Sequence, residues 1–183
     1  MSAPLRIAVY GPESTGKTEL ATKLAAHFGA PLVAEYARER WDAQGALGLE
    51  DMLPIAKEQW RREDAALLRQ GSGGHGARLV ICDTDALTTM LWSDVLYGTT
   101  PDEVRRGAEQ RCKNYALYLL LDIDVPFAPD PQRCFPDPAD REKAMRIWRG
   151  ALDRRHLPYE LIQGDWAQRE AAAIAAIERV RKA

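Results

Sequence analysis

The sequence has few cysteines, and their arrangement excludes two kinds of stabilising site. Cys82, Cys112 and Cys134 lie far apart in a chain of 183 residues. An odd number of widely spaced cysteines does not form a disulfide framework and is typical of a reducing compartment. Neither a Cys-x-x-Cys pair nor a His-x-x-x-His pair occurs, so the sequence indicates no structural metal site.

An excess of one charge and long hydrophobic runs are also lacking. The 25 basic and 27 acidic residues give a net charge of −2, which offers no electrostatic basis for binding nucleic acid or a membrane surface. Met1–Pro4 carries no charged leader, and no apolar stretch is long enough to span a membrane. We therefore expect a cytoplasmic protein without nucleic-acid or membrane partners. Its oligomeric state is left open.

Short apolar runs alternate with longer helical patterns along the chain. The runs that predict strands are Leu5–Tyr10, Leu32–Ala34, Leu79–Cys82, Ala116–Leu121 and Tyr159–Ile162. The helical patterns cover Thr18–Phe28, Leu53–Arg69, Pro138–His156 and Trp166–Lys182. This alternation predicts an α/β fold, with a five-stranded parallel sheet flanked by helices. The length suits one core, so we expect a single domain over residues 1–183.

Two connecting segments differ in composition from the rest. Asp122–Pro138 holds five of the eleven prolines and is too long for an ordinary turn. It predicts an active-site lid over about residues 122–141. Gly71–Gly76 is rich in glycine, but no helical pattern follows it, so we interpret it as a surface connector.

The segment Gly11–Thr18 matches the phosphate-binding pattern G-x-x-x-x-G-K-[ST] in full. It lies between a predicted strand and an amphipathic helix, the context that a P-loop requires. Glycines let the backbone amides turn toward phosphate, Lys17 supplies a charge to the outer phosphates, and Thr18 offers a hydroxyl to Mg²⁺. The sequence therefore predicts a P-loop nucleotide-kinase fold with ATP and Mg²⁺ as cofactors. The expected ATP contacts are Gly11, Glu13, Ser14, Thr15, Gly16, Lys17, Thr18 and Trp166.

Two acidic residues follow the third predicted strand. Asp83 and Asp85 lie where ligands bind in open α/β sheets, at the carboxyl edge. Asp83 is our candidate for holding Mg²⁺ together with Thr18, and Asp85 for positioning or deprotonating the acceptor hydroxyl. The residues alone leave open which acid has which role, and either can instead cap the next helix.

Further candidates surround this edge. Glu35, Tyr36 and Arg38 follow the second strand, where a phosphate acceptor binds in nucleotide kinases. Trp41, Trp92 and Tyr97 are expected mainly in the core, although Trp92 and Tyr97 follow the acids on one helix and can line the acceptor pocket. Arg133 and Arg141 belong to the lid, from which arginines can stabilise a transferring phosphoryl group. Trp166 suits either helix packing or contact with adenine.

Together these residues resemble the ribosylnicotinamide kinase domain of NadR-type proteins, an AAA_28-type P-loop kinase group. The matching segments are Gly11–Thr18, Glu35–Arg38, Asp83–Thr89, Tyr97–Gly98, Leu119–Asp124 and Gly164–Trp166. They span nearly the whole chain. The P-loop alone identifies only a superfamily, whereas Glu-Tyr-Ala-Arg with Asp-Thr-Asp is more specific. One departure is Asp130–Arg133, which reads Asp-Pro-Gln-Arg where the family's lid often carries Asp-Gly before its arginine.

The resemblance implies transfer of the ATP γ-phosphate to the 5′-hydroxyl of nicotinamide riboside, giving nicotinamide mononucleotide for NAD salvage. A pocket with Glu35, Asp83, Asp85 and aromatic rings would suit the flat pyridinium cation of that substrate. Bifunctional members carry an upstream adenylyltransferase domain. Since Met1 lies four residues before the first strand, we expect any adenylylation of the product to belong to another protein.

Alternative functions follow from the same P-loop. A kinase for another nucleoside or small metabolite is the closest, because the sequence does not display the acceptor pocket. A GTPase would need an Asn-Lys-x-Asp motif, which is missing. A P-loop ATPase or a nucleotide-binding regulatory module belongs to a different class, and slow ATP turnover that no small acceptor accelerates would favour it.

Overall fold

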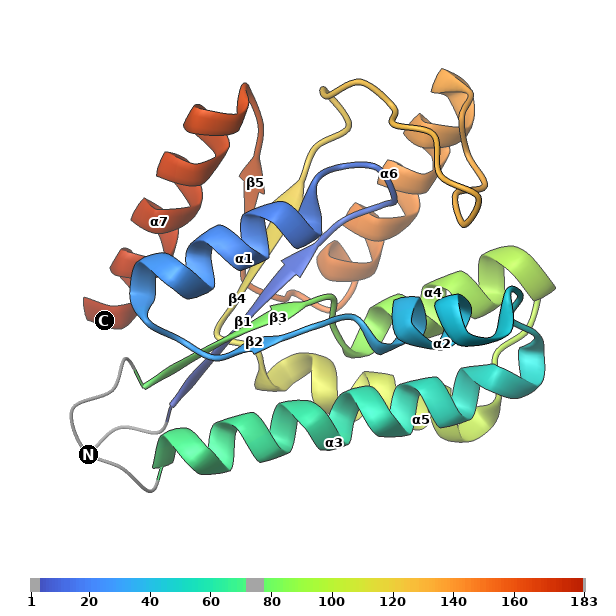
Figure 1. Cartoon of the computed structure of the whole chain (residues 1–183), viewed down its shortest axis with the longest axis horizontal. Coiled ribbons are helices and arrows are strands. Elements are labelled where there is room, and N and C mark those ends of the chain that lie inside the picture. The colour runs from blue at the N-terminus through green and yellow to red at the C-terminus, as the bar shows by residue number, and fades with distance from the viewer. Residues whose placement is uncertain (1–3, 72–77, 183) are drawn as a thin grey trace.

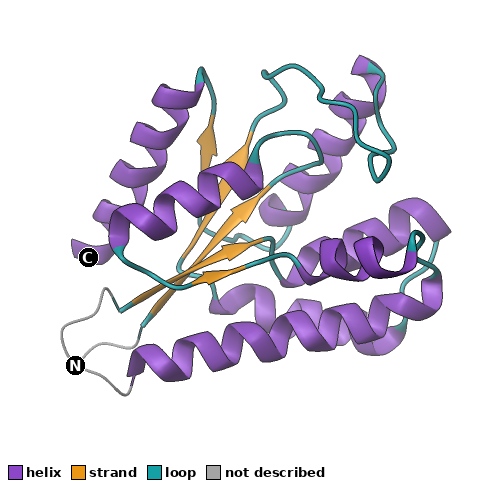
Figure 2. Cartoon of the chain, in the orientation of Figure 1, coloured by secondary structure: helices purple, strands orange, loops and turns teal. Residues whose placement is uncertain are grey.

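A computed structural model describes residues 4–71 and 78–182 of the chain and contains a five-stranded parallel sheet. The strands are β1 (Leu5–Tyr10), β2 (Leu32–Val33), β3 (Leu79–Asp83), β4 (Leu117–Leu121) and β5 (Tyr159–Ile162). Their order across the sheet is β2-β3-β1-β4-β5, with every pairing parallel (Figures 1 and 2). The predicted strands are confirmed to within one residue at each end.

Helices cover both faces of the sheet (Figure 1). They are α1 (Lys17–Phe28), α2 (Tyr36–Gln44), α3 (Met52–Gly71), α4 (Ala86–Tyr97), α5 (Asp102–Arg111), α6 (Pro138–Asp153) and α7 (Trp166–Lys182), with 3₁₀ turns η1 (Leu49–Asp51) and η2 (Cys112–Asn114). Helices α1 and α7 share one core with Ile7 and Val9 of β1, whereas α3 to α6 share the other with Ala8 and Tyr10. Successive strand side chains point to opposite faces, so continuous apolar strands feed both cores.

Several local predictions can be compared with this arrangement. Asp165 caps α7 as expected, since Asp165 and Gln168 each accept a hydrogen bond from the other's backbone amide, at 2.8 and 2.9 Å. The last residues of the segment predicted to be a lid form the first turn of α6, and its irregular part covers residues 122–137. We call residues 122–137 the proline-rich segment. Most of the predicted connector Gly71–Gly76 lies outside the described residues.

The sequence analysis gave no indication of two helices, α2 and α5. In the described part of the chain, every helix is too short or too polar to cross a membrane. All five strands end at one edge of the sheet, and β1, β2 and β3 lead there into the P-loop, Glu35 and Asp83 respectively. The topology therefore brings the main predicted groups to one place.

Candidate active site

The P-loop connects β1 to α1 and depends on its two glycines. Gly11 has φ +145°, and a Cβ atom there would lie 2.9 Å from the carbonyl oxygen of Leu121 on the neighbouring strand. Gly16 has φ +83° at the N-cap of α1, and a Cβ atom there would lie 2.5 Å from the ring of Trp166. Both positions therefore exclude a side chain on conformational and steric grounds. The loop leads straight into the N-terminus of α1, where a phosphate is favoured.

Lys17 and three carboxylates converge beside this loop. Burial lowers the pKa of Lys17, while the carboxylates of Glu35, Asp83 and Glu13 act in the opposite direction. The Lys17 ammonium donates a hydrogen bond to the carbonyl oxygen of Pro12 at 2.7 Å. Lys17 thus lies at the mouth of the P-loop with acidic side chains around it.

Asp83 ends β3 with its side chain only 2% exposed. Burial raises its pKa, against a hydrogen bond from Thr18 and the charge of Lys17. Among the described residues its Oδ1 atom has no hydrogen-bond partner. No group of three or more His, Cys, Asp or Glu side chains in the described part of the chain is arranged to hold a metal ion, so a metal here would need further ligands from bound phosphate or water. The Thr18 hydroxyl and the orphaned Asp83 oxygen fit Mg²⁺ held jointly by protein and nucleotide.

Glu35 and Asp85 both stand at the N-cap of a helix, but their carboxylates differ. Glu35 precedes α2 and makes no capping hydrogen bond. Burial, with a contribution from Asp83, raises its pKa to about 7 against the attraction of Lys17. Asp85 caps α4, accepting hydrogen bonds from the amides of Leu87 and Thr88 at 2.8 and 3.0 Å and from the Thr88 hydroxyl at 2.5 Å. Burial raises the pKa of Asp85 to about 6, against these bonds.

A cavity of about 870 Å³ extends from the P-loop between α2, α3 and α4. Glu35, Lys17 and Thr18 line it, whereas Asp85 and Tyr36 do not. Its far wall is aromatic and apolar, formed by Trp41, Leu47, Met52, Ile55, Trp92, Leu96 and Tyr97. Trp41, Trp92 and Tyr97, all expected mainly in the core, therefore line the cavity. The predicted acceptor residue Tyr36 instead packs beneath the Arg62 guanidinium, 4.5 Å from the ring centroid.

The proline-rich segment crosses over the P-loop and is tied to it by side chains of the loop itself. Glu13 accepts hydrogen bonds from the amides of Cys134 and Phe135 at 2.7 and 2.6 Å, and Ser14 accepts one from the amide of Ala128 at 2.8 Å. Glu13 and Ser14 were expected to contact ATP, and here their side chains hold the segment above the phosphate site.

The two arginines predicted for the lid have different positions. Arg133 lines the cavity and donates hydrogen bonds to Ser14 and to the carbonyl oxygen of Ala128. Arg141 lies in α6, outside the cavity lining, and donates to the carbonyl oxygen of Val125 at 3.0 Å. Arg38 on α2 reaches the segment through a 3.0 Å ion pair with Asp130. Of the two predicted lid arginines, Arg133 is therefore the one that can contact a bound phosphate. Arg141 instead holds the start of the proline-rich segment through Val125.

Comparison with known proteins agrees with this geometry. A family model described as an AAA domain (AAA_28) matches residues 6–169. The chain belongs to this family. A crystal structure of NadR protein in complex with NR superposes with a TM-score of 0.77 at 24% identity, covering 99% of this chain and 52% of that one. NadR protein in complex with NAD and AMP-PNP gives a TM-score of 0.76 at 21% identity, covering 99% and 50%.

A more distant likeness is found to deoxyadenosine kinase from M. mycoides, with a TM-score of 0.63 at 10% identity, covering 96% of this chain and 100% of that one. At these identities the likeness shows the fold, which is that of the P-loop nucleotide kinases. The chain spans about half the length of the NadR structures that it matches.

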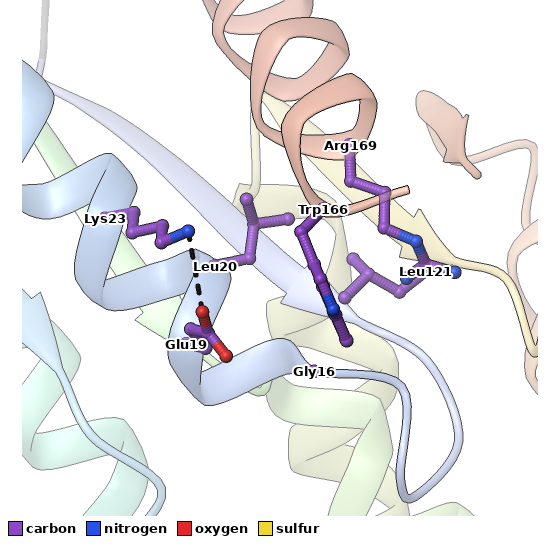
Figure 3. A pocket seen from close by; sticks show the side chains of 7 residues that line it. All are labelled: Gly16, Glu19, Leu20, Lys23, Leu121, Trp166 and Arg169. Atoms are coloured by element: carbon purple, nitrogen blue, oxygen red, sulfur yellow. Dashed lines mark ion pairs between the residues drawn. The ribbon is translucent and has the colours of Figure 1, made fainter. Parts of the chain in front are cut away.

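This AAA-domain chain also contains a buried arginine that the sequence analysis missed. Arg169 on α7 is 1% exposed and donates hydrogen bonds to the carbonyl oxygens of Thr15, Gly164 and Asp122, besides an ion pair with Asp124. It thereby joins the P-loop to the ends of β4 and β5. On the same helix, Trp166 stands against Gly16, as Figure 3 shows. An arginine in an alanine-rich helix gives no signal of burial, so no sequence pattern indicated this role.

Proposed function

We propose that the chain is an ATP-dependent kinase that phosphorylates the primary hydroxyl of a nucleoside, with nicotinamide riboside as the favoured acceptor. The proposal rests mainly on the position of Glu35. Its carboxylate lies beside Lys17 and Asp83, where the P-loop meets an aromatic-lined cavity. A proton acceptor at the junction of a phosphate site and an organic pocket is what phosphoryl transfer to a hydroxyl requires.

The donor side is formed by the P-loop and its neighbours. The loop amides and the N-terminus of α1 hold the phosphates of ATP, and Lys17 neutralises the outer ones. Mg²⁺, when bound with ATP, neutralises further phosphate charge, and Thr18 and Asp83 are the residues that would hold it. Arg133, from the proline-rich segment, balances the charge that spreads over the transferring group. Trp166 lies against Gly16 of the P-loop and lines the cavity, in a position to contact the adenine ring of bound ATP.

On the acceptor side, Glu35 takes the proton. The acceptor oxygen attacks the γ-phosphorus and forms a new P–O bond, its proton passes to the Glu35 carboxylate, and the bond from the γ-phosphorus to the bridging oxygen breaks to release ADP. A pKa of about 7 keeps Glu35 partly ionised at neutral pH and able to accept this proton. Asp85, whose oxygens are occupied by α4, positions that helix rather than the substrate.

The choice of nicotinamide riboside is supported by the character of the cavity. Its wall combines Trp41, Trp92 and Tyr97 with the Glu35 carboxylate, which suits a flat cationic ring through cation–π contact and charge. The likeness to NadR protein in complex with NR points in the same direction. Product formed in this way would enter NAD synthesis.

The test is ADP release from Mg-ATP with a panel of acceptors, namely nicotinamide riboside, nicotinic acid riboside, adenosine, uridine, thymidine and water alone. We expect strong stimulation by nicotinamide riboside, lost in Lys17→Ala. Stimulation by another nucleoside instead would support the kinase mechanism but refute nicotinamide riboside as the favoured acceptor. A slow ATPase that no acceptor accelerates would favour a regulatory module or an ATPase instead.

A further inference from the structure

Thr84 has a backbone conformation that its side chain disfavours. It lies between Asp83 and Asp85, at the turn from β3 into α4, and its φ is +93°. Positive φ is a genuine outlier for a β-branched residue and destabilises the folded chain. The amide of Thr84 donates a hydrogen bond to the carbonyl oxygen of Val9 at 3.1 Å, which helps to hold this turn. Such strain persists only where the surrounding structure enforces it, and strained residues cluster at active sites and ligand-binding turns.

The hydroxyl of Thr84 is also left without a partner. The side chain is 4% exposed, and among residues 4–71 and 78–182 its Oγ1 atom finds no hydrogen-bond partner. The other buried threonines are all satisfied: Thr15 donates to Pro12 at 2.9 Å, Thr88 to Asp85 at 2.5 Å and Thr100 to Asp94 at 2.7 Å. An unsatisfied buried hydroxyl is costly in the folded protein, so a ligand is the natural partner.

The location of Thr84 indicates which ligand. Thr84 lines the same cavity as Glu35. It directly follows Asp83, which belongs to the phosphate side of the site. Thr88 and Thr89, one turn further along the chain, line the acceptor side. Thr84 therefore lies at the junction where, in the proposed reaction, the acceptor oxygen approaches the γ-phosphate. It can donate one hydrogen bond and still accept another, so it can orient an alcohol without taking its proton.

We propose that the Thr84 hydroxyl hydrogen-bonds to the nucleophilic hydroxyl of the acceptor and orients it for attack while Glu35 removes its proton. This inference rests on the proposed kinase function and adds a substrate-contacting residue to it. The strain and the missing partner are then features of a site that is completed only when the acceptor binds.

The inference is tested with Thr84→Val, which keeps the branched shape and removes the hydroxyl, and Thr84→Ser, which keeps the hydroxyl. Acceptor-dependent transfer, acceptor-independent ATP hydrolysis and the melting temperature without ligand are measured for each. We expect about a tenfold fall in kcat/KM for the acceptor in Thr84→Val, with hydrolysis within about twofold and an unchanged or higher melting temperature. Thr84→Ser should stay within about threefold of wild type. Thr99→Val, at an exposed threonine outside the cavity, is the matched control.

Thr84→Gly is a second variant without the hydroxyl, and it keeps the test valid if Thr84→Val does not fold. Glycine adopts positive φ without strain, so we expect this variant to fold. It should melt higher than wild type and lose transfer as the valine variant does. Unchanged transfer in either variant, or a parallel fall in transfer and hydrolysis, would overturn the inference. A wild-type protein that transfers phosphate to none of the acceptors would instead overturn the kinase function and this inference with it, so the two failures are distinguishable.

Discussion

Replacement of Glu35 by glutamine should make the protein more stable and less active. Burial raises the pKa of Glu35 from 4.5 to about 7, so the folded chain holds a proton that the unfolded chain has already lost in that range. Stability therefore falls as pH rises from about 4.5 to 7, and the cost is fully present above 7. The net shift, which already includes the attraction to Lys17, corresponds to roughly 3 kcal/mol.

The stability half of this prediction is read from melting curves of the wild type and Glu35→Gln between pH 4 and pH 9. Their difference should be near zero at pH 4 and grow until about pH 7, reaching at most about 6–12 °C for a chain of this size. Asp85 and Glu63 also have raised pKa values, about 6 and about 7, through burial, but they are present in both proteins. The difference between the two curves therefore isolates Glu35.

The activity half is read from kcat/KM for the acceptor over the same range. A general base must be ionised, so the wild-type rate should rise through about pH 7 and then level off. Glu35→Gln should lose about 10²- to 10⁴-fold at the plateau, and its profile should lack this rise. A wild-type profile that is flat from pH 6 to pH 8, or a glutamine variant within threefold of wild type, would refute the assignment of Glu35 as the base.

Three other changes separate metal binding, positioning and donor binding. Asp83→Asn should raise the Mg²⁺ concentration needed for half-maximal turnover about tenfold, measured by Mg²⁺ titration at fixed ATP, with Lys17→Ala as the variant that Mg²⁺ does not rescue. Arg169→Met should lower the free energy of unfolding in urea by about 3–5 kcal/mol because it leaves buried acceptors unpaired, whereas the exposed Arg179→Met should cost less than about 1 kcal/mol. Equal costs would contradict the role assigned to Arg169. Trp166→Ala should raise KM for ATP and leave KM for the acceptor unchanged, and the reverse result would exclude a donor-side position.

The elements that the sequence predicted are those with a strong burial pattern. The five strands are short, mainly apolar runs, and the three central ones, β1, β3 and β4, are buried almost throughout. The ends of all five were placed to within one residue. The helices that were missed bury little: α2 has no buried side chain, and α5 buries only Val104 and Ala108. Helix α2 therefore has no apolar stripe that periodicity could reveal, whereas α5 has a short one of only two residues, Val104 and Ala108, one turn apart.

The site divides in a similar way. The P-loop was predictable because its geometry is local, whereas the surroundings of Tyr36, Arg141 and Arg169 depend on tertiary packing. Tyr36 shares a motif with Glu35 and Arg38, yet the first turn of α2 sends it away from the cavity. Arg169 joins segments more than forty residues apart, and no pattern around it differs from that of a solvent-exposed helix.

The distinction between Glu35 and Asp85 was nevertheless present in the choice of residue. Both occupy an N-cap, where aspartate is strongly preferred because its short side chain reaches the free amides of the first turn. The oxygens of Asp85 are occupied by such hydrogen bonds from the first turn of α4. The longer Glu35 makes no capping hydrogen bond, so its carboxylate remains free to face the cavity. An aspartate at an N-cap thus indicates structure, and a glutamate there leaves a charge for another purpose.

This reasoning predicts that Glu35→Asp is a more damaging change than its chemistry suggests. The shorter carboxylate should be captured by the first-turn amides of α2, as that of Asp85 is by α4. Hydrogen bonds from amides favour the ionised form, so the apparent pKa in the rate profile should fall below 7, while capping stabilises the fold by about 1 kcal/mol. We expect kcat/KM for the acceptor to fall about 10²-fold, because the base is retained but turned away from the acceptor. An aspartate variant with near-normal turnover and an unshifted profile would show that capping does not decide between the two acids.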